Sequence, residues 1–319
     1  LSKGGYHARA NRTVYIFTWV YLGICVLSFL LYWLAGMSVF DAVNHAFSVS
    51  ATGGFSTKNL SIAAFDSVPI SIITMVMMFL SSIHFGIIFL VLVKRSLKPL
   101  KNEVLGLYVL YLSVFSVVSA IILKAEGFAQ RWDLAFLEGS FQMLSYASTT
   151  GLAIADNANY PFFVSMMMMM AGTVCGMAGS TTGGIKSDRL LILTKSLRAH
   201  LHGALHPTSV TEVKFSGRNI YMQDMYPHIL YIAIFMLVWL VSALITMASG
   251  VDTQNAMMAT LSSIGNVGPA VGELGTFGNF GSQPEFAKFV YTLDMFMGRV
   301  EIYPVMAIFY ILFERRGRR

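Results

Sequence analysis

Long apolar runs alternate with short amphipathic segments along the chain, in an order that recurs three times. Each recurrence consists of a long apolar run, a short segment, a glycine-containing turn and a second long apolar run. As a helix, about 20 apolar residues cross the roughly 30 Å hydrocarbon core of a bilayer. The predicted spans occupy residues 14–34, 69–93, 105–123, 162–177, 225–248 and 285–313.

The short segments between paired spans are predicted helices that are too short to cross a bilayer. They cover residues 38–50, 133–147 and 253–263. Ser38 and Asp41 have the spacing of an N-terminal cap for the first helix, and Asp133 is a predicted cap for the second. A glycine turn follows each helix: ATGGF at 51–55, STTGL at 148–152 and GNVGP at 265–269.

The recurrence of the turns indicates one shared cavity. Backbone that leaves the helix at membrane depth is tolerated only where protein buries it or where it lines a watery space. Glycine permits unusual dihedral angles, and rings of carbonyl oxygens replace the hydration shell of a cation. The C-terminal end of each short helix adds partial negative charge at the same place. The pattern therefore predicts a cation pore in preference to ordinary loops.

The second span of the middle recurrence is interrupted. It starts near Pro161, is apolar to residue 177, and then gives way to six small residues: Gly179, Ser180, Thr181, Thr182, Gly183 and Gly184. A basic amphipathic stretch at 185–201 follows. At this depth the break is either a flexible interruption or a mobile gate beneath the turns, and we favour the gate. Replacing it with continuous helix is then expected to alter gating and leave ion selectivity unchanged.

The same six residues superficially resemble a phosphate-binding loop. That motif ends in Gly-Lys-Ser/Thr, whereas Ile185 separates Gly184 from Lys186 here. The surrounding apolar helices also lack the parallel strands of a nucleotide-binding domain. Nucleotide binding at this loop is therefore not supported.

Arg299 lies deep inside the last predicted span. A charge near the centre of a bilayer costs at least about 2.5–3.5 kcal/mol and marks a functional position by default. Two interpretations stay open: a fixed positive charge that faces the pore and contacts the broken helix, or a structural arginine paired with Glu301 or Asp294. We favour the pore-facing arrangement.

Composition agrees with a polytopic membrane protein. Of the 319 residues, 55% are apolar and 12% are charged, with a mean hydropathy of +0.64, whereas soluble domains carry about 25% charged residues. Cys25 and Cys175 both lie in apolar runs, so neither a disulfide framework nor a metal cluster is predicted. His45 and His84 lack partners at metal-ligand spacing and are expected to be hydrogen-bonded within the protein.

The net charge of +6 marks topology rather than nucleic-acid binding. Seventeen of the 22 lysines and arginines fall in four clusters, in alternate loops. The clusters are Lys3, Arg9 and Arg12; Lys94, Arg95, Lys98 and Lys101; Lys186, Arg189, Lys195, Arg198, Lys214 and Arg218; and Arg315, Arg316, Arg318 and Arg319. The positive-inside rule places all four clusters in the cytoplasm, together with the C-terminus, and the glycine turns toward the outer side.

An intramembrane hydrolase is a competing class of function. It requires a nucleophile such as Ser180 with a histidine base within reach. Ser180 is predicted near the cytoplasmic side and His45 near the outer side. The expected geometry therefore argues against an enzyme.

Six motifs in this order resemble the Trk/Ktr/HKT superfamily of potassium transporters, over nearly the whole chain. They are FDAxxHAF at 40–47, GGFST at 53–57, STTG at 148–151, AGSTxGGxK at 178–186, NxGP at 266–269 and GRxE at 298–301. Members of that superfamily have four units of span, pore helix, filter and span around one pore. Each unit contributes one filter glycine.

The resemblance implies an all-α polytopic membrane protein with three of the four units of a pseudo-fourfold pore, at 1–103, 104–205 and 206–319. It implies K⁺ as the transported ion and no organic cofactor. The implied K⁺-binding filter consists of Thr52, Gly53, Gly54, Thr149, Thr150, Gly151, Asn266, Val267 and Gly268. The implied gate consists of the loop from Gly179 to Gly184 together with Arg299.

The resemblance also implies partners and leaves alternatives open. It implies a homodimer in the cytoplasmic (inner) membrane, contacting lipid and a cytosolic ring of nucleotide-binding RCK-type subunits, without nucleic acid. The first unit, whose filter residue shifts K⁺ toward Na⁺ in related plant members, is absent, so a Na⁺-permeable member stays possible. A broken-helix secondary carrier is the alternative from another class, and channel-like flux and H⁺- or Na⁺-coupled symport are both open. The chain begins without Met in a cytoplasmic-looking segment, so we expect it to be the C-terminal part of a longer polypeptide.

Overall fold

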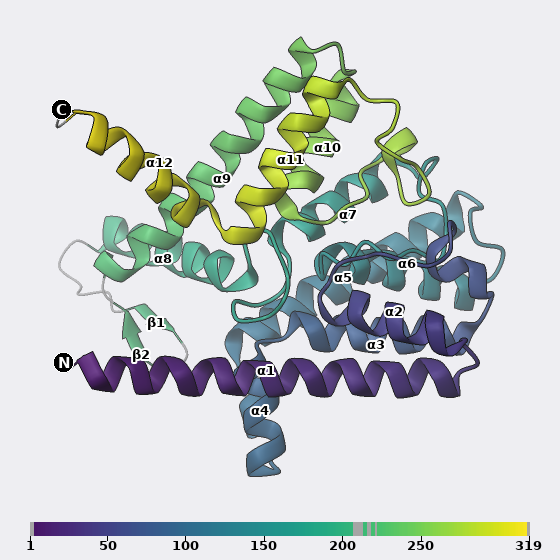
Figure 1. Ribbon diagram of the computed structural model, residues 1–319, viewed down its shortest axis with the longest axis horizontal. Helices are drawn as coiled ribbons and strands as arrows, with labels where there is room; N and C mark the ends of the chain where they lie inside the picture. Colours follow the sequence, from purple (N-terminus) through teal and green to yellow (C-terminus); the bar gives the residue numbers. More distant parts are fainter. Residues whose placement is uncertain (1–2, 207–212, 216–217, 221, 318–319) are drawn as a thin grey trace.

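The computed structural model describes residues 3–206, 213–215, 218–220 and 222–317. The described chain is helical except for one small hairpin (Figure 1). The helices are α1 Lys3–Leu34, α2 Val39–Ser50, α3 Val68–Ser82, α4 Phe85–Lys94, α5 Glu103–Ala125, α6 Trp132–Ala147, α7 Phe162–Val174, α8 Ser187–Leu205, α9 Met222–Ala248, α10 Thr253–Gly265, α11 Glu285–Val300 and α12 Ile302–Gly317. Short 3₁₀ turns occur at Ser61–Phe65, Lys98–Leu100 and Gly272–Leu274.

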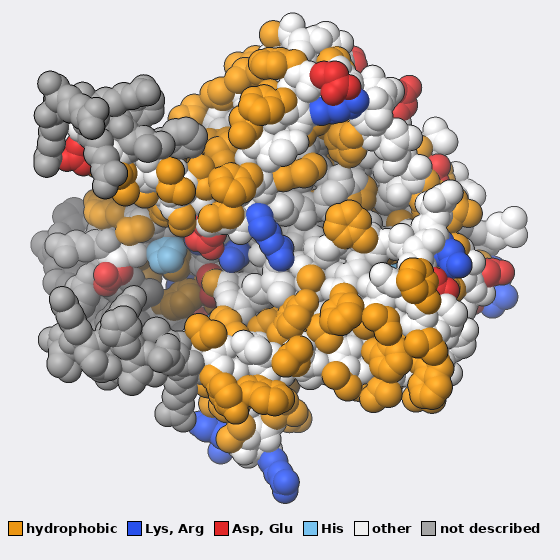
Figure 2. Space-filling model, in the orientation of Figure 1, with side chains coloured by type: hydrophobic (Ala, Val, Ile, Leu, Met, Phe, Trp, Pro, Cys, Tyr) orange, Lys and Arg blue, Asp and Glu red, His pale blue; other side chains and the backbone are white. Residues whose placement is uncertain are grey.

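The first span of each recurrence is one unbroken helix. Three stretches are long and apolar enough to cross a membrane: Thr13–Leu34 in α1, Glu103–Ala125 in α5 and Asp224–Ala248 in α9. The fold is therefore that of a polytopic helical membrane protein, and these three stretches agree with the predicted first spans. Figure 2 shows apolar side chains spread over much of one face of the molecule, as lipid contact requires.

The short helices α2 and α6 pack mainly against the span before them, α1 and α5, whereas α10 packs against both α9 and α11. The predicted cap of α2 is present, because the Ser38 hydroxyl accepts the backbone N–H of Asp41 at 3.1 Å. The predicted cap of α6 is wrong. Arg131 precedes this helix, and Asp133 lies in its first turn, where it pairs with the Arg131 side chain at 2.8 Å.

The predicted span at 69–93 is not one helix. Helices α3 and α4 meet at a bend of 99°, and α4 projects away from the other helices (Figure 1). Neither Gly nor Pro stands at the break, where Ile83 is extended and the Nδ1 atom of His84 accepts the N–H of Gly86. The carbonyls that would continue the helix accept hydrogen bonds from a distant loop instead, so tertiary contacts set the bend.

The other two second spans are also broken. α7 ends at Val174, three residues earlier than expected, and residues 175–186 form a loop before α8, which we call the interrupting loop. The predicted helix at 285–313 is divided into α11 and α12 by Glu301, whose φ of 69° no helix contains. All three second spans thus leave the helical conformation part-way along.

The predicted polar linker at 206–224 contains a two-stranded antiparallel hairpin. Strand β1 (Val213–Phe215) pairs with β2 (Arg218–Ile220), with Val213 opposite Ile220. The all-α expectation therefore holds for the spans but not for this hairpin. Linker residues 207–212, 216–217 and 221, and the basic residues Arg318 and Arg319, lie outside the described residues.

Candidate functional site

The three short helices end in the same hydrogen-bonded closure. In each turn the N–H of the third residue bonds a carbonyl five residues back, and the N–H of the second residue bonds a carbonyl three residues back. The first set is Gly53 to Ser48 at 2.8 Å, Thr150 to Ser145 at 2.9 Å and Val267 to Ser262 at 3.0 Å. The second set is Thr52 to Val49, Thr149 to Tyr146 and Asn266 to Ser263. This is the Schellman arrangement, which satisfies the last carbonyls of a helix.

The backbone angles of the turns also match. The second residue is left-handed in all three turns, with φ of 51° at Thr52, 52° at Thr149 and 56° at Asn266. The fourth residue is a glycine with positive φ: 73° at Gly54, 75° at Gly151 and 99° at Gly268. Asparagine tolerates the left-handed region, but a β-branched threonine there is strained by about 1–3 kcal/mol. Surrounding contacts must therefore hold the two threonines.

One cavity of about 680 Å³ brings the turns together. Of the residues implied as a filter, those that line it are Thr52, Gly53, Gly54, Thr150, Gly151, Asn266, Val267 and Gly268. Arg299 lines it as well. Thr149 does not line it, and its hydroxyl instead accepts the N–H of Gly183.

Neighbouring turns are in backbone contact on two sides of this cavity. A Cβ atom on Gly54 would lie 2.0 Å from the carbonyl oxygen of Thr150, and one on Gly151 would lie 2.5 Å from that of Val267. Only glycine allows such an approach. A Cβ atom on Gly268 would meet nothing within 4 Å. The third turn therefore faces open space among the described residues.

The interrupting loop lies directly against the turns. The carbonyl oxygen of Thr181 accepts the Thr52 hydroxyl at 2.9 Å and the Arg299 guanidinium at 2.8 Å. The N–H of Gly183 donates to the Thr149 hydroxyl at 2.9 Å. The Thr181 hydroxyl is also within 3.1 Å of the carbonyl oxygens of Ser50 and Ser81.

The other predicted gate residues shape this loop. The carbonyl of Gly179 accepts the N–H of Phe85 at 3.0 Å, which joins the loop to the break between α3 and α4. The hydroxyl of Ser180 donates to Met177 and lies 2.8 Å from that of Thr182. At Gly184, where φ is 63°, a Cβ atom would lie 2.8 Å from the Cys175 sulfur. The loop is therefore a closely packed, hydrogen-bonded segment.

Arg299 pairs with neither acidic residue considered for it. Its guanidinium donates to the carbonyls of Thr181 at 2.8 Å and Ala51 at 3.2 Å. Asp294 is buried and accepts the Ser242 hydroxyl at 2.7 Å instead. Arg299 thus places a positive charge at the cavity and joins the interrupting loop to the first turn.

Glu301 has a role that the sequence did not reveal. Its carboxylate pairs with Lys186 at 3.2 Å and Arg189 at 2.8 Å. Lys186 and Glu301 both have φ of 69°, so each terminates the loop or helix on its side of the break. The guanidinium of Arg189 also stacks over the Tyr231 ring at 3.7 Å. From the sequence, Glu301 was considered only as a partner of Arg299, although the motifs GRxE and GGxK end in opposite charges.

Side chains of α2 support the segment after the first turn. Asp41 accepts the hydroxyl of Thr57, and the ring of His45 bonds both the Asp41 carbonyl at 2.8 Å and the Ser56 hydroxyl at 2.9 Å. Hydrogen bonds from Thr57 and Ser38 hold the pKa of the Asp41 carboxyl below its usual value. His45 is therefore hydrogen-bonded within the protein, as expected.

The other two turns use a serine for the same purpose. The Ser145 hydroxyl donates to the carbonyl of Leu152 at 2.5 Å, and the Ser262 hydroxyl donates to that of Pro269 at 2.8 Å. Both serines lie on the short helix and both acceptors follow the glycine of the turn. The equivalent Ser48 has a buried hydroxyl with no protein partner. The first turn is thus supported by Asp41 and His45, and sequence analysis assigned no role to either serine.

Comparison with known proteins decides the family. The TrkH family model, described as a cation transport protein, matches residues 2–114 and 103–316. The chain belongs to the TrkH family. A crystal structure of the potassium transporter TrkH from Vibrio parahaemolyticus superposes with a TM-score of 0.86 at 29% identity, covering 94% of this chain and 64% of that chain.

Curated TrkH-family relatives match along almost the whole chain. The Trk system potassium uptake protein TrkH of Vibrio parahaemolyticus is 30% identical over 94% of this chain, and that of Escherichia coli K12 is 30% identical over 97%. The Trk system potassium uptake protein TrkG of Escherichia coli K12 is 29% identical over 97%. The chain spans 62–63% of the length of these relatives.

TrkH-family membership makes this a membrane protein of a cation transport family, not an enzyme family. The hydrolase alternative also finds no geometry, because Ser180 bonds Met177 and Thr182 whereas His45 bonds Asp41 and Ser56. Within the described residues, no group of His, Cys, Asp or Glu has the arrangement of a metal site. The polar groups that the described residues place at the cavity are backbone carbonyls, hydroxyls, the side-chain amide of Asn266 and the guanidinium of Arg299.

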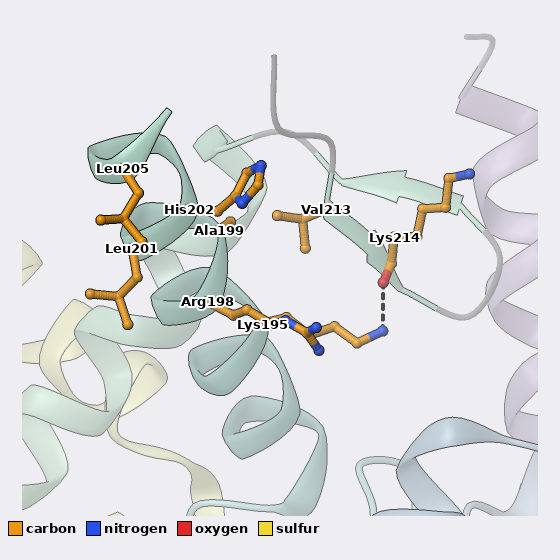
Figure 3. Close-up of a pocket in the computed structure, with 8 residues that line it drawn as sticks. All are labelled: Lys195, Arg198, Ala199, Leu201, His202, Leu205, Val213 and Lys214. Carbon is orange, nitrogen blue, oxygen red and sulfur yellow. Dashed lines mark hydrogen bonds between the residues drawn. The ribbon is translucent and has the colours of Figure 1, made fainter. Parts of the chain in front are cut away.

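A second concave feature of this TrkH-family chain lies between α8 and β1 (Figure 3). It is a groove of about 470 Å³ with Lys195, Arg198, His202 and Lys214 among its polar residues and Leu201, Leu205 and Val213 among its apolar ones. The ammonium group of Lys195 donates to the backbone carbonyl of Lys214 at 2.6 Å and pairs with Glu103. The groove is part of the third basic cluster and is separate from the central cavity.

Proposed function

We propose that the chain supplies three sides of a potassium-uptake pore in the cytoplasmic membrane. The observation that carries this proposal is the threefold recurrence of one turn geometry around one cavity. A Schellman closure alone is common at helix ends. Three that each have a positive-φ glycine two residues further on and that meet at one cavity are unexpected for loops that only connect helices. The relatives named as potassium uptake proteins add support for K⁺ as the ion.

The proposed filter consists of the nine turn residues from Thr52 to Gly54, Thr149 to Gly151 and Asn266 to Gly268. Their carbonyl oxygens replace the hydration shell of K⁺, as in other carbonyl-lined filters. The three short helices end at this cavity, so the partial negative charge of their C-termini favours a cation. Among the described residues, no side-chain carboxylate lines the cavity, which suits a monovalent ion that must leave as readily as it binds.

The proposed ring has four positions, of which the units at 1–103, 104–205 and 206–319 occupy three. Gly54 approaches the second turn and Gly151 approaches the third, whereas Gly268 faces free space. A fourth filter segment, placed in the same relation, would lie against Gly268. The open side of the third turn is thus the position we assign to it.

The proposed gate is the loop from Gly179 to Gly184 together with Arg299. The loop lies against the inner face of the turns and is held by bonds to Thr52, Thr149 and Arg299. In this arrangement the loop blocks the path of the ion, and the guanidinium opposes a cation electrostatically. Opening requires the loop to leave the turns.

The proposed orientation has the basic clusters and the C-terminus in the cytoplasm, as the positive-inside rule requires. The starts of α1 and α9 and the ends of α8 and α12 gather at the same end of the molecule (Figure 1). We assign the groove between α8 and β1 to contact with an acidic surface of a cytosolic RCK-type regulatory subunit, because Arg198 and Lys214 are exposed there. A homodimer in the membrane completes the proposed assembly.

Rubidium uptake by the complete gene product in K⁺-uptake-deficient cells tests the pore. We compare wild type with Gly268→Ser, which strains a backbone with φ of 99° without creating a clash. Gly250→Ser is the matched control, because Gly250 has φ of 93° and equally open surroundings but lies between α9 and α10. Saturable uptake that K⁺ inhibits, that Gly268→Ser weakens and that Gly250→Ser preserves supports the filter.

The same assay separates the alternatives. Uptake that Na⁺ inhibits as strongly as K⁺ identifies a Na⁺-permeable member. Flux that is indifferent to Gly268, with uptake of an organic substrate, favours a secondary carrier built on broken helices. Dependence of uptake on a proton or sodium gradient distinguishes symport from channel-like flux.

A further inference from the structure

Three left-handed residues, one from each turn, contact the interrupting loop. Thr52, Thr149 and Asn266 occupy the same position of the three Schellman closures. Left-handed backbone is natural for asparagine but unfavourable for a β-branched residue. Two of the three turns therefore place threonine where glycine or asparagine would be less strained.

The hydroxyl groups of both threonines are hydrogen-bonded to the loop. Thr52 donates to the carbonyl oxygen of Thr181 at 2.9 Å and lies 2.7 Å from that of its neighbour Ala51. Thr149 accepts the N–H of Gly183 at 2.9 Å. Both side chains are buried, with exposed fractions of 4% and 1%, so water cannot replace these bonds.

The third left-handed residue packs against the same part of the loop. A Cβ atom on Gly183 would lie 2.9 Å from the Cβ atom of Asn266 and 2.5 Å from the carbonyl oxygen of Gly265. The loop thus touches all three turns at Thr181 and Gly183, by two hydrogen bonds and one backbone contact. A loop that only blocked the path would need no such matched contacts.

We propose that Thr52 and Thr149 are positioning residues that couple the state of the loop to the geometry of the filter. Their strained backbone is compensated only while the loop is seated, so departure of the loop lets the turns relax. This inference rests on the proposed filter and gate. It differs from the independent gate that the sequence alone suggested, because loop changes now alter ion binding at the filter too.

Coupling of this kind is reciprocal. An ion held by the filter carbonyls favours the strained turn, and the seated loop favours the same turn. Each therefore strengthens the other by the same factor. Raising the K⁺ concentration is expected to protect the seated loop.

The test measures the loop and the filter separately in proteoliposomes containing the complete gene product. Loop seating is read from the rate at which a thiol reagent modifies Ser180→Cys, a half-buried loop position. Cys175 belongs to the loop and its thiol donates to the carbonyl of Gly183, so every variant carries Cys175→Ser, and the same protein without Ser180→Cys gives the background rate. Filter geometry is read from equilibrium Rb⁺ binding in competition with Na⁺, because the loop-seated state binds ions but carries no flux.

Thr149→Val keeps the branched shape and the strain but removes the hydroxyl. We expect modification of the loop to accelerate about fivefold, the effect of one neutral hydrogen bond, and the preference of the filter for binding Rb⁺ over Na⁺ to fall by a similar factor. Thr149→Ser restores the hydroxyl and is expected to recover most of both values. Thr246→Val is the matched control, because its buried hydroxyl bonds only within α9.

Thr149→Gly keeps the test decisive if the valine variant does not fold. Glycine adopts the left-handed conformation without strain, so the loop should still loosen while the binding preference for Rb⁺ over Na⁺ falls less than in Thr149→Val. Modification rates at the wild-type level in both variants, with K⁺ giving no protection, overturn the coupling. Gly268→Ser separates the two failures. If it leaves the binding preference unchanged, the filter assignment itself is wrong; if it lowers the preference, only the coupling is wrong.

Discussion

The first and second spans of this chain follow opposite rules. The first spans, in α1, α5 and α9, are unbroken and present apolar side chains outward, for example Leu30 at 42% exposed and Leu244 at 64%. The second spans are all broken, between α3 and α4, α7 and α8, and α11 and α12. Backbone hydrogen bonds join the break between α3 and α4 to the break between α7 and α8. Arg299 joins the third break to the interrupting loop, and Glu301 joins it to α8.

The difference shows where backbone polar groups can be exposed within a membrane protein. An unbroken helix satisfies its own N–H and C=O groups, which is required against lipid. A broken helix leaves carbonyl groups without a partner in the helix, and here N–H groups outside that helix bond to them. The N–H of Met177 donates to the carbonyl of Ser82 and that of Ile185 to the carbonyl of Thr173, both at 2.9 Å. The first spans therefore act as a scaffold, while the second spans provide the groups that surround the cavity.

Glycine substitution should give the largest contrast between the two kinds of span. A Cβ atom on Gly298 in α11 would lie 2.0 Å from the carbonyl oxygen of Ile264, whereas one on Gly106 in α5 would meet nothing within 4 Å. Gly298→Ala is expected to destabilise the protein by about 3 kcal/mol or more through overpacking against backbone. Gly106→Ala is expected to be stabilising by up to about 1 kcal/mol. Thermal unfolding in detergent measures both, and equal losses would remove the distinction.

Neutralising Arg299 should have the next largest effect. Its two hydrogen bonds to carbonyls are charge-assisted, each contributing about 1.5–3 kcal/mol, so Arg299→Gln is expected to raise Rb⁺ leak by about tenfold or more. Arg299→Lys retains the positive charge but lacks the planar guanidinium with its several donors, so its Rb⁺ leak should lie between those of wild type and Arg299→Gln. Lys288→Gln, at an exposed pair on the same helix, is the control. Loss of folded protein without leak would instead assign Arg299 a structural role.

Removing the charge of Glu301 should produce a smaller effect. Glu301→Gln loses the pairs to Lys186 and Arg189, which are partly exposed, so the cost is expected to be about 1 kcal/mol and to shrink at high salt. We expect a severalfold change in Rb⁺ flux, because these pairs join α8 to the break between α11 and α12. Glu103→Gln breaks a comparable pair outside the breaks. An equal flux change in that control would show that the position of the pair is unimportant.

Acid should affect the first turn least of all. The pKa of Asp41 is lowered in the folded protein by hydrogen bonds from Thr57 and Ser38, so the ionised carboxylate stabilises the fold above the unfolded pKa of about 3.9. This contribution is lost as the pH falls through the folded pKa. Asp41→Asn is expected to lower the free energy of unfolding by under about 1 kcal/mol at neutral pH and to flatten the dependence of stability on pH below pH 4. Unfolding temperatures between pH 3 and 6 check this, and an unchanged slope in the variant would contradict it.

Local chemistry was enough to predict much of the fold. The apolar runs fixed the three first spans, the cap at Ser38 fixed the start of α2, and the matching glycine turns indicated one cavity. These features depend on residues close together in the chain, as amphipathic pattern, capping and turn formation do. The turn residues and the small-residue loop were therefore identified without any knowledge of their neighbours in space.

The bend at Ile83 and the partners of the freed groups were decided by tertiary structure. No Gly or Pro marks the bend at Ile83, and the bonds that compensate for it come from residues about a hundred positions away, as between Thr181 and Ser81. Pro304, in the first turn of α12, cannot donate to the carbonyl of Val300 and so favours the break at Glu301, but it does not specify what Glu301 contacts. The same applies to Arg299, whose partners are carbonyls of two other units rather than its acidic neighbours. A sequence pattern records which groups a helix can satisfy internally. Which carbonyls lack a helical partner, and which donors bond to them, depends on surfaces that meet only when the units pack together.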